Sequence, residues 1–169
     1  MFGGGLRRAP SRVEGGGMIL PIGAEATLEV RHPVLRPGRA RADAIFSCDE
    51  AEGTRHFGSY AETGRLVGVV TVHPACWVRP PAVADLVVEA GAWQLRGMAT
   101  LPEVRGEGHG VRLVKAAERC VRSAGAGLCW CNARVAAIGF YEKLGWEVVG
   151  GEFEIATVGP HFRMVRLLG

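Results

Sequence analysis

The chain has 169 residues, of which 48% are hydrophobic and 22% are charged, and its formal net charge is +3. This length suits one domain with a full hydrophobic core, and the composition excludes a chain that is disordered throughout. The positive residues are spread along the sequence, which disfavours a nucleic-acid surface and suits a small anionic ligand. No apolar run reaches the ~20 residues that span a bilayer, so we expect no membrane segment and a cytoplasmic protein.

Residues 1–17 are rich in glycine and lack the apolar centre of a secretory signal. We therefore expect a flexible N-terminal extension, followed by a single domain over residues 18–169. The chain has five cysteines and no CxxC pair, and Cys129 and Cys131 are the closest two. This spacing predicts free thiols and no metal site.

The first half of the domain contains one predicted helix and a predicted hairpin. Apolar residues at helical spacing predict a helix over 27–38, and residues 42–53 have turn composition. Two strands, 55–62 and 65–73, are expected to form the hairpin, with Thr63-Gly64 at its turn.

The second half alternates strands with helices. Residues 74–91 form an irregular, proline-containing connector, and 92–100 is predicted as a strand. A helix is expected over 111–124, with Gly125 at its end, because apolar residues recur there at helical spacing. The remaining predicted elements are a buried strand over 127–135, a short helix over 136–145 and two last strands over 146–155 and 161–168. This order predicts a mixed α/β domain.

A glycine-rich turn joins the strand 92–100 to the following helix. The segment places Arg105, Gly106, Gly108 and Gly110 at the helix start. Glycines allow close approach of the backbone, the first N–H groups of a helix are unpaired, and arginine binds phosphate. The turn therefore predicts a pyrophosphate site. The spacing does not match GxGxxG, and no GK[ST] follows, which argues against a Rossmann turn and a P-loop.

Four segments then carry a family resemblance. Arg105-x-x-Gly108-x-Gly110, after "ATLPEV" and before an amphipathic helix, resembles the acyl-CoA pyrophosphate motif of the GNAT N-acetyltransferase superfamily. "FYEKLGW" (140–146) is similar to the family's FYxxLGF segment, with Trp146 in place of phenylalanine. "GEFEIATVGPHFRM" (151–164) and the early "RHPVLRPG" resemble one bacterial branch of uncharacterised members. The resemblance covers about residues 18–168.

The resemblance implies a GNAT fold, a mixed and mostly antiparallel sheet flanked by helices, with splayed central strands. Strand 92–100 would be the fourth strand, and strand 127–133 would diverge from it and leave a gap for the thioester of acetyl-CoA. Backbone groups of the fourth strand would bind the pantetheine arm, and the turn would bind the pyrophosphate. The implied cofactor-binding residues are Met98, Ala99, Thr100, Arg105, Gly106, Glu107, Gly108, His109 and Gly110.

The resemblance also implies a catalytic role for Tyr141, which would protonate the departing CoA thiolate. Many members carry asparagine seven residues earlier, where this chain has Arg134, and Asn132 lies two residues before that. We assign Arg134 to the cofactor site, but the usual asparagine contact does not transfer directly. A core aromatic is the alternative interpretation of Tyr141, because it shares a helix face with Ile138 and Leu144.

The expected activity is acetyl transfer from acetyl-CoA, without a metal, to a primary amine of a small molecule or peptide. The alternative is an acyl-CoA-binding module without turnover. The sequence does not identify the base, since a relayed water competes with four side chains: Glu152, Glu154, His73 and His161. Neither the acceptor nor the oligomeric state follows from the sequence, and a homodimer stays open.

Three further interpretations concern charged residues. Arg31, His32 and Arg36 are either surface charges or a patch that faces the substrate. His109 is expected to be an exposed loop residue whose backbone N–H matters and whose ring does not. His161 is interpreted as structural, with catalysis kept as the alternative.

Overall fold

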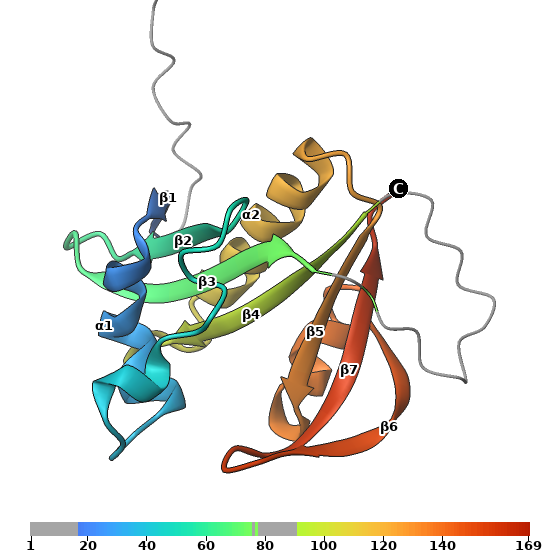
Figure 1. Ribbon diagram of the computed structural model, residues 1–169. Helices are drawn as coiled ribbons and strands as arrows, with labels where there is room; N and C mark the ends of the chain where they lie inside the picture. The colour runs from blue at the N-terminus through green and yellow to red at the C-terminus, as the bar shows by residue number, and fades with distance from the viewer. Residues whose placement is uncertain (1–16, 76, 78–90) are drawn as a thin grey trace, which may run out of the picture.

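The structure is a computed structural model that describes residues 17–75, 77 and 91–169. The described residues form one seven-stranded sheet with the order β1-β2-β3-β4-β5-β7-β6. All neighbouring strands are antiparallel except β4 and β5, which are parallel. Helix α1 lies on one side of this sheet and α2 on the other (Figure 1). This is the mixed, mostly antiparallel α/β architecture that the sequence predicts.

The elements follow one another along the chain with short connections. The strands are β1 (Met18–Ile22), β2 (Arg55–Tyr60), β3 (Leu66–Pro74), β4 (Ala92–Thr100), β5 (Leu128–Arg134), β6 (Glu147–Ile155) and β7 (Gly159–Leu167). The α-helices are α1 (Ala24–Leu35), α2 (His109–Ser123) and α3 (Ile138–Glu142). Short 3₁₀ turns are η1 (Arg41–Ala44), η3 (Pro102–Val104) and η4 (Val135–Ala137).

Strand β3 lies at the centre of the first arm of the sheet and is buried on both faces. Val67 and Val69 pack with Val30 of α1, whereas Val70 and Val72 pack with α2 residues such as Leu113. A run of β-branched residues suits this position, because side chains of a strand alternate between the two faces and both faces are covered here. The helices are therefore fixed against the strand that borders β4.

The parallel strands β4 and β5 pair over only three residues and then diverge. The paired residues are Ala92, Trp93 and Gln94 of β4 with Leu128, Cys129 and Trp130 of β5. Figure 1 shows the two strands close at one end and apart at the other. Beyond Gln94, the edge of β4 that faces β5 pairs with no strand among the described residues. The splayed central strands that the family resemblance implies are thus present.

Most predicted elements are confirmed, with shifts at their ends. The helix predicted over 27–38 begins at Ala24 and ends at Leu35, and the strand predicted over 92–100 matches β4. The hairpin and the later strands and helices are present as predicted. Strand β1 is an addition: its five residues include Pro21, which is tolerated because β1 is an edge strand of the sheet.

Two predicted segments lie partly outside the described residues. These are residues 1–16 of the expected extension and most of the 74–91 connector, which are not described. Gly17, which the sequence assigns to the extension, is described, and a Cβ atom there would overlap the carbonyl oxygen of Tyr60 on β2.

Candidate active site

A cavity of about 730 Å³ occupies the gap between the diverging strands. Its walls come from the second half of β4, the end of β5, the start of α2, α3 and the β6–β7 end. Ten of the eleven predicted site residues line it: Met98, Ala99, Thr100, Arg105, Gly106, Gly108, His109, Gly110, Arg134 and Tyr141. The exception is Glu107, whose side chain is exposed and whose carbonyl accepts a hydrogen bond from Arg112 Nη1 at 3.1 Å.

The glycine turn forms one end of the cavity, at the N-terminus of α2. Gly106 and Gly108 have φ angles of +87° and +80°, in the left-handed region that favours glycine. Gly108 is the N-cap of a helix of fifteen residues, and no side chain caps it. The first N–H groups of α2 and the positive end of its dipole are therefore directed toward the cavity, where an anion is stabilised.

The unpaired edge of β4 forms the adjacent wall. Leu101 donates its N–H to Val67 O of β3 at 2.8 Å, and Ala99 is opposite Val69 in the same ladder. Because successive residues of a strand direct their backbone groups to opposite edges, those of Met98 and Thr100 face the gap toward β5. Both residues thus present hydrogen-bonding groups to a ligand that would lie between the strands.

A β-bulge shapes this strand beside the gap. The register between β3 and β4 shifts between Val69 and Thr71, and Gly97 has a φ angle of +60°. A Cβ atom at Gly97 would lie 2.7 Å from Phe46 Cε2 and 2.9 Å from Arg31 Nε. Glycine is therefore required here for its backbone angle and for the close packing of two side chains.

Tyr141 lies on α3 with its ring in the core and its side chain on the cavity wall. It is 5% exposed, and its ring packs against Phe140 and Trp146 at centroid distances of 5.1 and 5.3 Å. Burial raises the pKa of Tyr141 well above its usual range, with a smaller contribution from Cys131. The raised pKa keeps the phenol protonated at neutral pH, and Tyr141 is one of the residues that line the cavity.

These features match a family known from other proteins. A sequence profile of the acetyltransferase (GNAT) family matches residues 25–146. The chain belongs to this family. It is an acyl-CoA-dependent acetyltransferase, as the sequence predicts. The curated "Uncharacterized N-acetyltransferase YitI" of Bacillus subtilis (strain 168) is 37% identical over 147 residues, which cover 87% of this chain and 93% of that protein.

Solved structures show the same fold. ElaA of Escherichia coli superposes with a TM-score of 0.67 at 19% identity, covering 89% of this chain and 99% of that chain. An aminoglycoside 6'-N-acetyltransferase complexed with coenzyme A has a TM-score of 0.67 at 16% identity, covering 89% and 97%. At these identities the likeness establishes the fold of this GNAT protein and leaves its acceptor open.

His109 departs from its predicted exposure. The side chain is 3% exposed, and its Nδ1 lies 2.7 Å from Ser59 Oγ of β2, while Nε2 lies 3.6 Å from a carboxylate oxygen of Glu107. Burial and the nearby charge of Arg112 lower the pKa of His109. The neutral ring accepts a hydrogen bond from the Ser59 hydroxyl, which links the start of α2 to β2. The ring therefore has a structural role that the sequence did not indicate.

The four candidate bases of this GNAT protein differ in whether they line the cavity. His161 of β7 lines the cavity, whereas Glu152, Glu154 and His73 do not. Its ring is 4% exposed, and Nδ1 donates to Gly159 O at 2.7 Å. In the tautomer that makes this hydrogen bond, the lone pair of the ring is on Nε2. Of the four candidates, His161 is thus the one that lies on the cavity wall.

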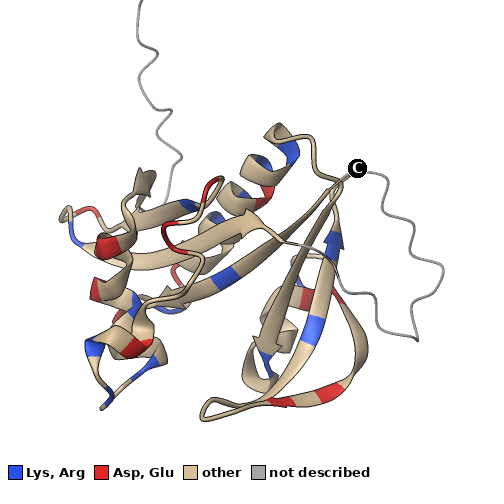
Figure 2. Cartoon of the chain, in the orientation of Figure 1, with Lys and Arg blue, Asp and Glu red and all other residues tan. Residues whose placement is uncertain are grey.

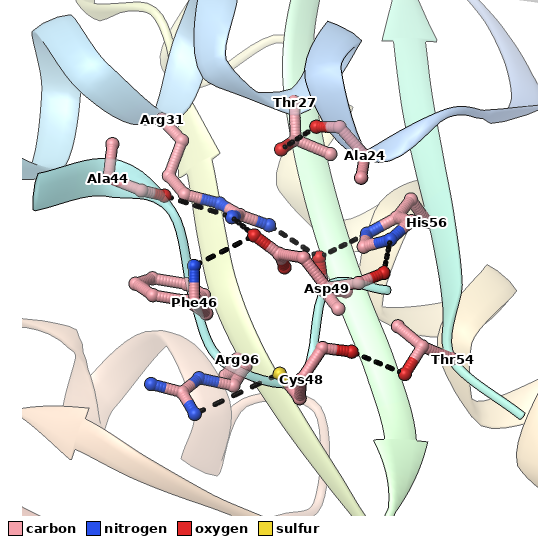
Figure 3. A network of polar contacts seen from close by, with 11 residues as sticks. Ala24, Thr27, Arg31, Ala44, Phe46, Cys48, Asp49, Thr54, His56 and Arg96 are labelled. Carbon is pink, nitrogen blue, oxygen red and sulfur yellow. Dashed lines mark hydrogen bonds and ion pairs between the residues drawn. The ribbon is translucent and has the colours of Figure 1, made fainter. Parts of the chain in front are cut away.

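Arg31 is neither a surface charge nor part of a substrate-facing patch, which corrects both interpretations of it. It is fully buried, and its guanidinium donates to Asp49 Oδ2 at 2.7 Å, to Ala44 O at 3.0 Å and to Thr71 Oγ1 at 2.7 Å. Figure 3 shows this network between α1, the segment before β2 and the sheet. His56 extends it, because its ring nitrogens contact Thr71 Oγ1 and Asp49 O at 2.8 and 3.0 Å.

The network supports an aromatic side chain at the cavity wall. Phe46 N donates to Asp49 Oδ2 at 2.8 Å, which holds the loop in place. The guanidinium groups of Arg31 and Arg96 each lie 4.2 Å from the centre of the Phe46 ring, and the ring lies between them in Figure 3. Phe46 and Arg96 line the cavity, and Arg31, which does not line it, packs against the Phe46 ring.

Two more arginines reach the cavity from opposite arms of the sheet. Arg36 follows α1 and Arg134 ends β5, and their guanidinium groups donate to the same carbonyl, Leu35 O, at 2.9 and 3.1 Å. Burial, followed by the charges of Arg134 and Arg39, lowers the pKa of Arg36. Lys and Arg are otherwise spread over both arms in Figure 2, with no single basic face in that view.

Sequence reasoning missed Phe46 and Arg96 as wall residues. Residues 42–53 showed only turn composition, and Arg96 stood in an ordinary strand pattern. The one local signal was Gly97 inside that strand, because a glycine within a strand often marks a bulge or a close approach. His32 is half-buried, and its Nε2 contacts Arg39 O at 2.8 Å in the loop after α1, away from the cavity lining.

Three further findings concern the described residues alone. No helix among them is long and apolar enough to cross a membrane, and no group of three or more metal-ligating side chains occurs. The described cysteines, Cys48, Cys120, Cys129 and Cys131, are free, as predicted, and Cys76 lies outside the described residues.

Proposed function

We propose that this GNAT protein transfers the acetyl group of acetyl-CoA to a primary amine of a small molecule or peptide by direct attack. The observation that carries the proposal is the gap between β4 and β5, which opens onto the glycine turn at the start of α2. A cavity of this form can receive an extended thiol ester with its phosphates at one end. The CoA bound to the aminoglycoside acetyltransferase of the same fold supports the same assignment.

In this proposal the turn from Arg105 to Gly110 binds the pyrophosphate through its N–H groups, and the Arg105 side chain adds a positive charge. The pantetheine amides pair with β4 as an additional strand would. The alternation along β4 favours Met98 and Thr100 over Ala99 for these bonds, since Ala99 is turned to β3. We place Arg134, which the sequence assigned to the cofactor, beside the acceptor instead, because its guanidinium donates to Leu35 O at the end of α1 at 3.1 Å.

The reaction would proceed through a tetrahedral intermediate. The neutral amine attacks the thioester carbon, and N–H groups on the open edge of β4 stabilise the oxyanion. The C–S bond then breaks, the acetyl group remains on nitrogen as an amide, and the sulfur leaves as a thiolate that gains a proton. Tyr141 would supply this proton or a hydrogen bond to sulfur, and His161 Nε2 would accept the proton that the amine loses.

The competing function is an acyl-CoA-binding module without turnover. Two observations disfavour it: the protonated phenol of Tyr141 lines the cavity, and His161 has an acceptor nitrogen in the same cavity. A module that only bound CoA would need neither group. Amine-dependent release of CoA thiol from acetyl-CoA by the purified protein, with a panel of amines, separates the two functions.

The pyrophosphate site is tested by a pair of glycine variants on α2. Gly108→Ala adds a methyl group at a left-handed residue on the cavity wall, and Gly125→Ala does the same at the other end of the helix, where φ is +74° and no atom lies within 4 Å. Each substitution should cost about 1 kcal/mol of stability. We expect calorimetry to show acetyl-CoA affinity about tenfold weaker in Gly108→Ala only. Equal affinities in the two variants would contradict the site.

A further inference from the structure

We propose that the acceptor amine carries an anionic group, a carboxylate or a phosphate, which binds to Arg36, Arg96 and Arg134 in the acceptor part of the cavity. This inference rests on the proposed acetyl transfer and specifies its acceptor. It follows from three guanidinium groups that reach one cavity from three different elements: the end of α1, the middle of β4 and the end of β5.

The hydrogen bonds of these arginines leave their charges uncompensated. Arg36 and Arg134 donate to the neutral carbonyl of Leu35, and Arg96 contacts Cys48 Sγ at 3.9 Å. Within the described part of the chain, none of the three forms an ion pair with a carboxylate. Arg36 and Arg96 are partly buried, Arg134 is exposed, and the charges of Arg134 and Arg96 both act on Arg36. Neighbouring like charges that line one cavity point to an anion that binds there.

The cavity offers no negative charge of its own. None of its lining residues within the described chain is Asp or Glu. The negative charge of Asp43 acts on Arg36, but this carboxylate forms an ion pair with Arg39 at 3.0 Å and does not line the cavity. A polycationic amine would meet only like charges, whereas an amine with a nearby carboxylate or phosphate would be attracted and oriented.

The same charges assist the chemistry. Most amines are protonated at neutral pH and must lose a proton before they attack. A positive potential disfavours the ammonium form and lowers the pKa of the bound amine. The anionic group of the acceptor pairs with the arginines, which offsets the repulsion between them and the ammonium form of the amine. The ammonium proton is then transferred to His161 Nε2 or to water. The cluster therefore accounts for both binding and activation of the acceptor.

The cavity also has apolar walls. Phe46, Ile155 and Val158 are among its lining residues, and Ile155 is the last residue of β6. Arg39 of the loop after α1 donates to Thr157 Oγ1 at 3.1 Å, so the two arms of the molecule meet beside these residues. An acceptor with its anion on the arginines can place an uncharged side chain here, as an amino acid or its phosphonate analogue would.

The test compares matched amines. Thiol release from acetyl-CoA is measured with the twenty common amino acids, their amides, the corresponding decarboxylated amines and the aminoalkylphosphonates. We expect at least one acid to exceed both of its uncharged partners in kcat/KM by about tenfold or more, because hydrogen bonds to charged groups are the strong ones. Comparing kcat/KM for the carboxylic acids with kcat/KM for the phosphonic acids shows which of the two anions the site prefers. Neutral amines that react as well as their acids would overturn the inference and leave acetyl transfer intact.

Variants then assign the effect to the cluster. Arg36→Gln removes one charge from the cavity, and Arg41→Gln removes an exposed charge that is paired with Glu25 and does not line the cavity. We expect KM for the anionic amine to rise about tenfold in Arg36→Gln alone, with KM for acetyl-CoA unchanged, and partial rescue in Arg36→Lys. An equal rise in both variants would overturn the inference. If the wild-type protein released no thiol with any amine of the panel, the proposed acetyl transfer itself would be overturned.

Discussion

Tyr141 combines two properties that are often treated as alternatives. Its ring packs against Phe140 and Trp146 as a core aromatic does, and its side chain also lines the cavity between β4 and β5. The packing fixes where the hydroxyl lies, and burial keeps the phenol protonated by raising its pKa. A residue held this rigidly can donate to a departing sulfur without reorganisation.

Tyr141→Phe separates the two roles because it keeps the ring and removes only the hydroxyl. If the phenol assists the leaving thiolate, kcat should fall by about 10²- to 10⁴-fold while acetyl-CoA affinity stays the same. Steady-state kinetics and calorimetry measure the two quantities. Tyr60→Phe on β2, outside the cavity lining, is the matched control and should keep its turnover. Wild-type turnover in Tyr141→Phe would restrict the residue to the core.

His109 gives a prediction about pH and stability. Its pKa is lowered in the folded state from a usual value of 6.5, so the unfolded chain binds more protons between the two pKa values. The free energy of unfolding therefore rises with pH in that window: this contribution is complete above about pH 6.5 and is lost as the pH falls through the folded pKa.

His109→Asn removes the titrating ring and keeps an oxygen that can accept the Ser59 hydroxyl. Urea unfolding at about pH 7.5 and about pH 5 should show a larger loss of stability in the wild type than in the variant. His73, whose pKa is also lowered by burial, is present in both proteins and cancels in the comparison. A larger acid loss in His109→Asn would contradict the assignment of a neutral, buried ring.

At the scale of elements, a buried ion pair and its hydrogen bonds hold the segment between α1 and β2 in place. Arg31 of α1 reaches Ala44 O and Asp49, and Asp49 also accepts from Phe46 N. A buried ion pair holds a loop only while both partners and their hydrogen bonds are present. Phe46 and the cavity wall depend on this arrangement.

Asp49→Asn should therefore destabilise the protein strongly, because it leaves the Arg31 charge buried without its partner. We expect a loss of about 3–5 kcal/mol in the free energy of unfolding, measured with urea. Asp43→Asn breaks an exposed pair with Arg39, whose side chains are both 40% exposed, and should cost less than about 1 kcal/mol. Similar losses in the two variants would mean that the buried network contributes little.

The whole molecule consists of two arms of one sheet that diverge at the gap. One arm carries β1 to β4 with α1 and α2, and the other carries β5 to β7 with α3. Hydrogen bonds span the open side: Arg39 donates to Thr157 O and Oγ1, and Arg134 donates to Leu35 O at 3.1 Å. Both arms contribute walls to the cavity, so the site exists only in the complete domain.

We propose that this domain folds without residues 1–16. Gly17 already packs against the Tyr60 carbonyl, so the unit begins one residue before the boundary expected from the sequence. The preceding segment has too little apolar surface to offset the entropy of ordering. A chain that begins at Gly17, behind an initiator methionine, should keep its melting temperature and its acetyl-CoA affinity. A decrease of several degrees would show that the segment contributes to the fold.

The sequence by itself determined the parts of this protein that depend on neighbouring residues. Apolar spacing and glycine positions predicted the hairpin, β4, α2 and the glycine turn, because backbone angles and helix starts are set within a few residues. The turn and the FYEKLGW segment also identified the family correctly. Through that resemblance, ten residues that line the cavity were named from the sequence.

Only the tertiary structure decided which side chains meet across the chain. Ser59 and His109 are 50 residues apart, Arg31 and Thr71 are 40 apart, and Arg134 and Leu35 are 99 apart. No periodic pattern encodes such pairs, since each depends on how the strands align and where β4 and β5 diverge. For this reason the burial of Arg31 and His109, the hydrogen bond that orients the His161 ring, and the presence of Arg96 in the cavity wall emerged only from the tertiary structure.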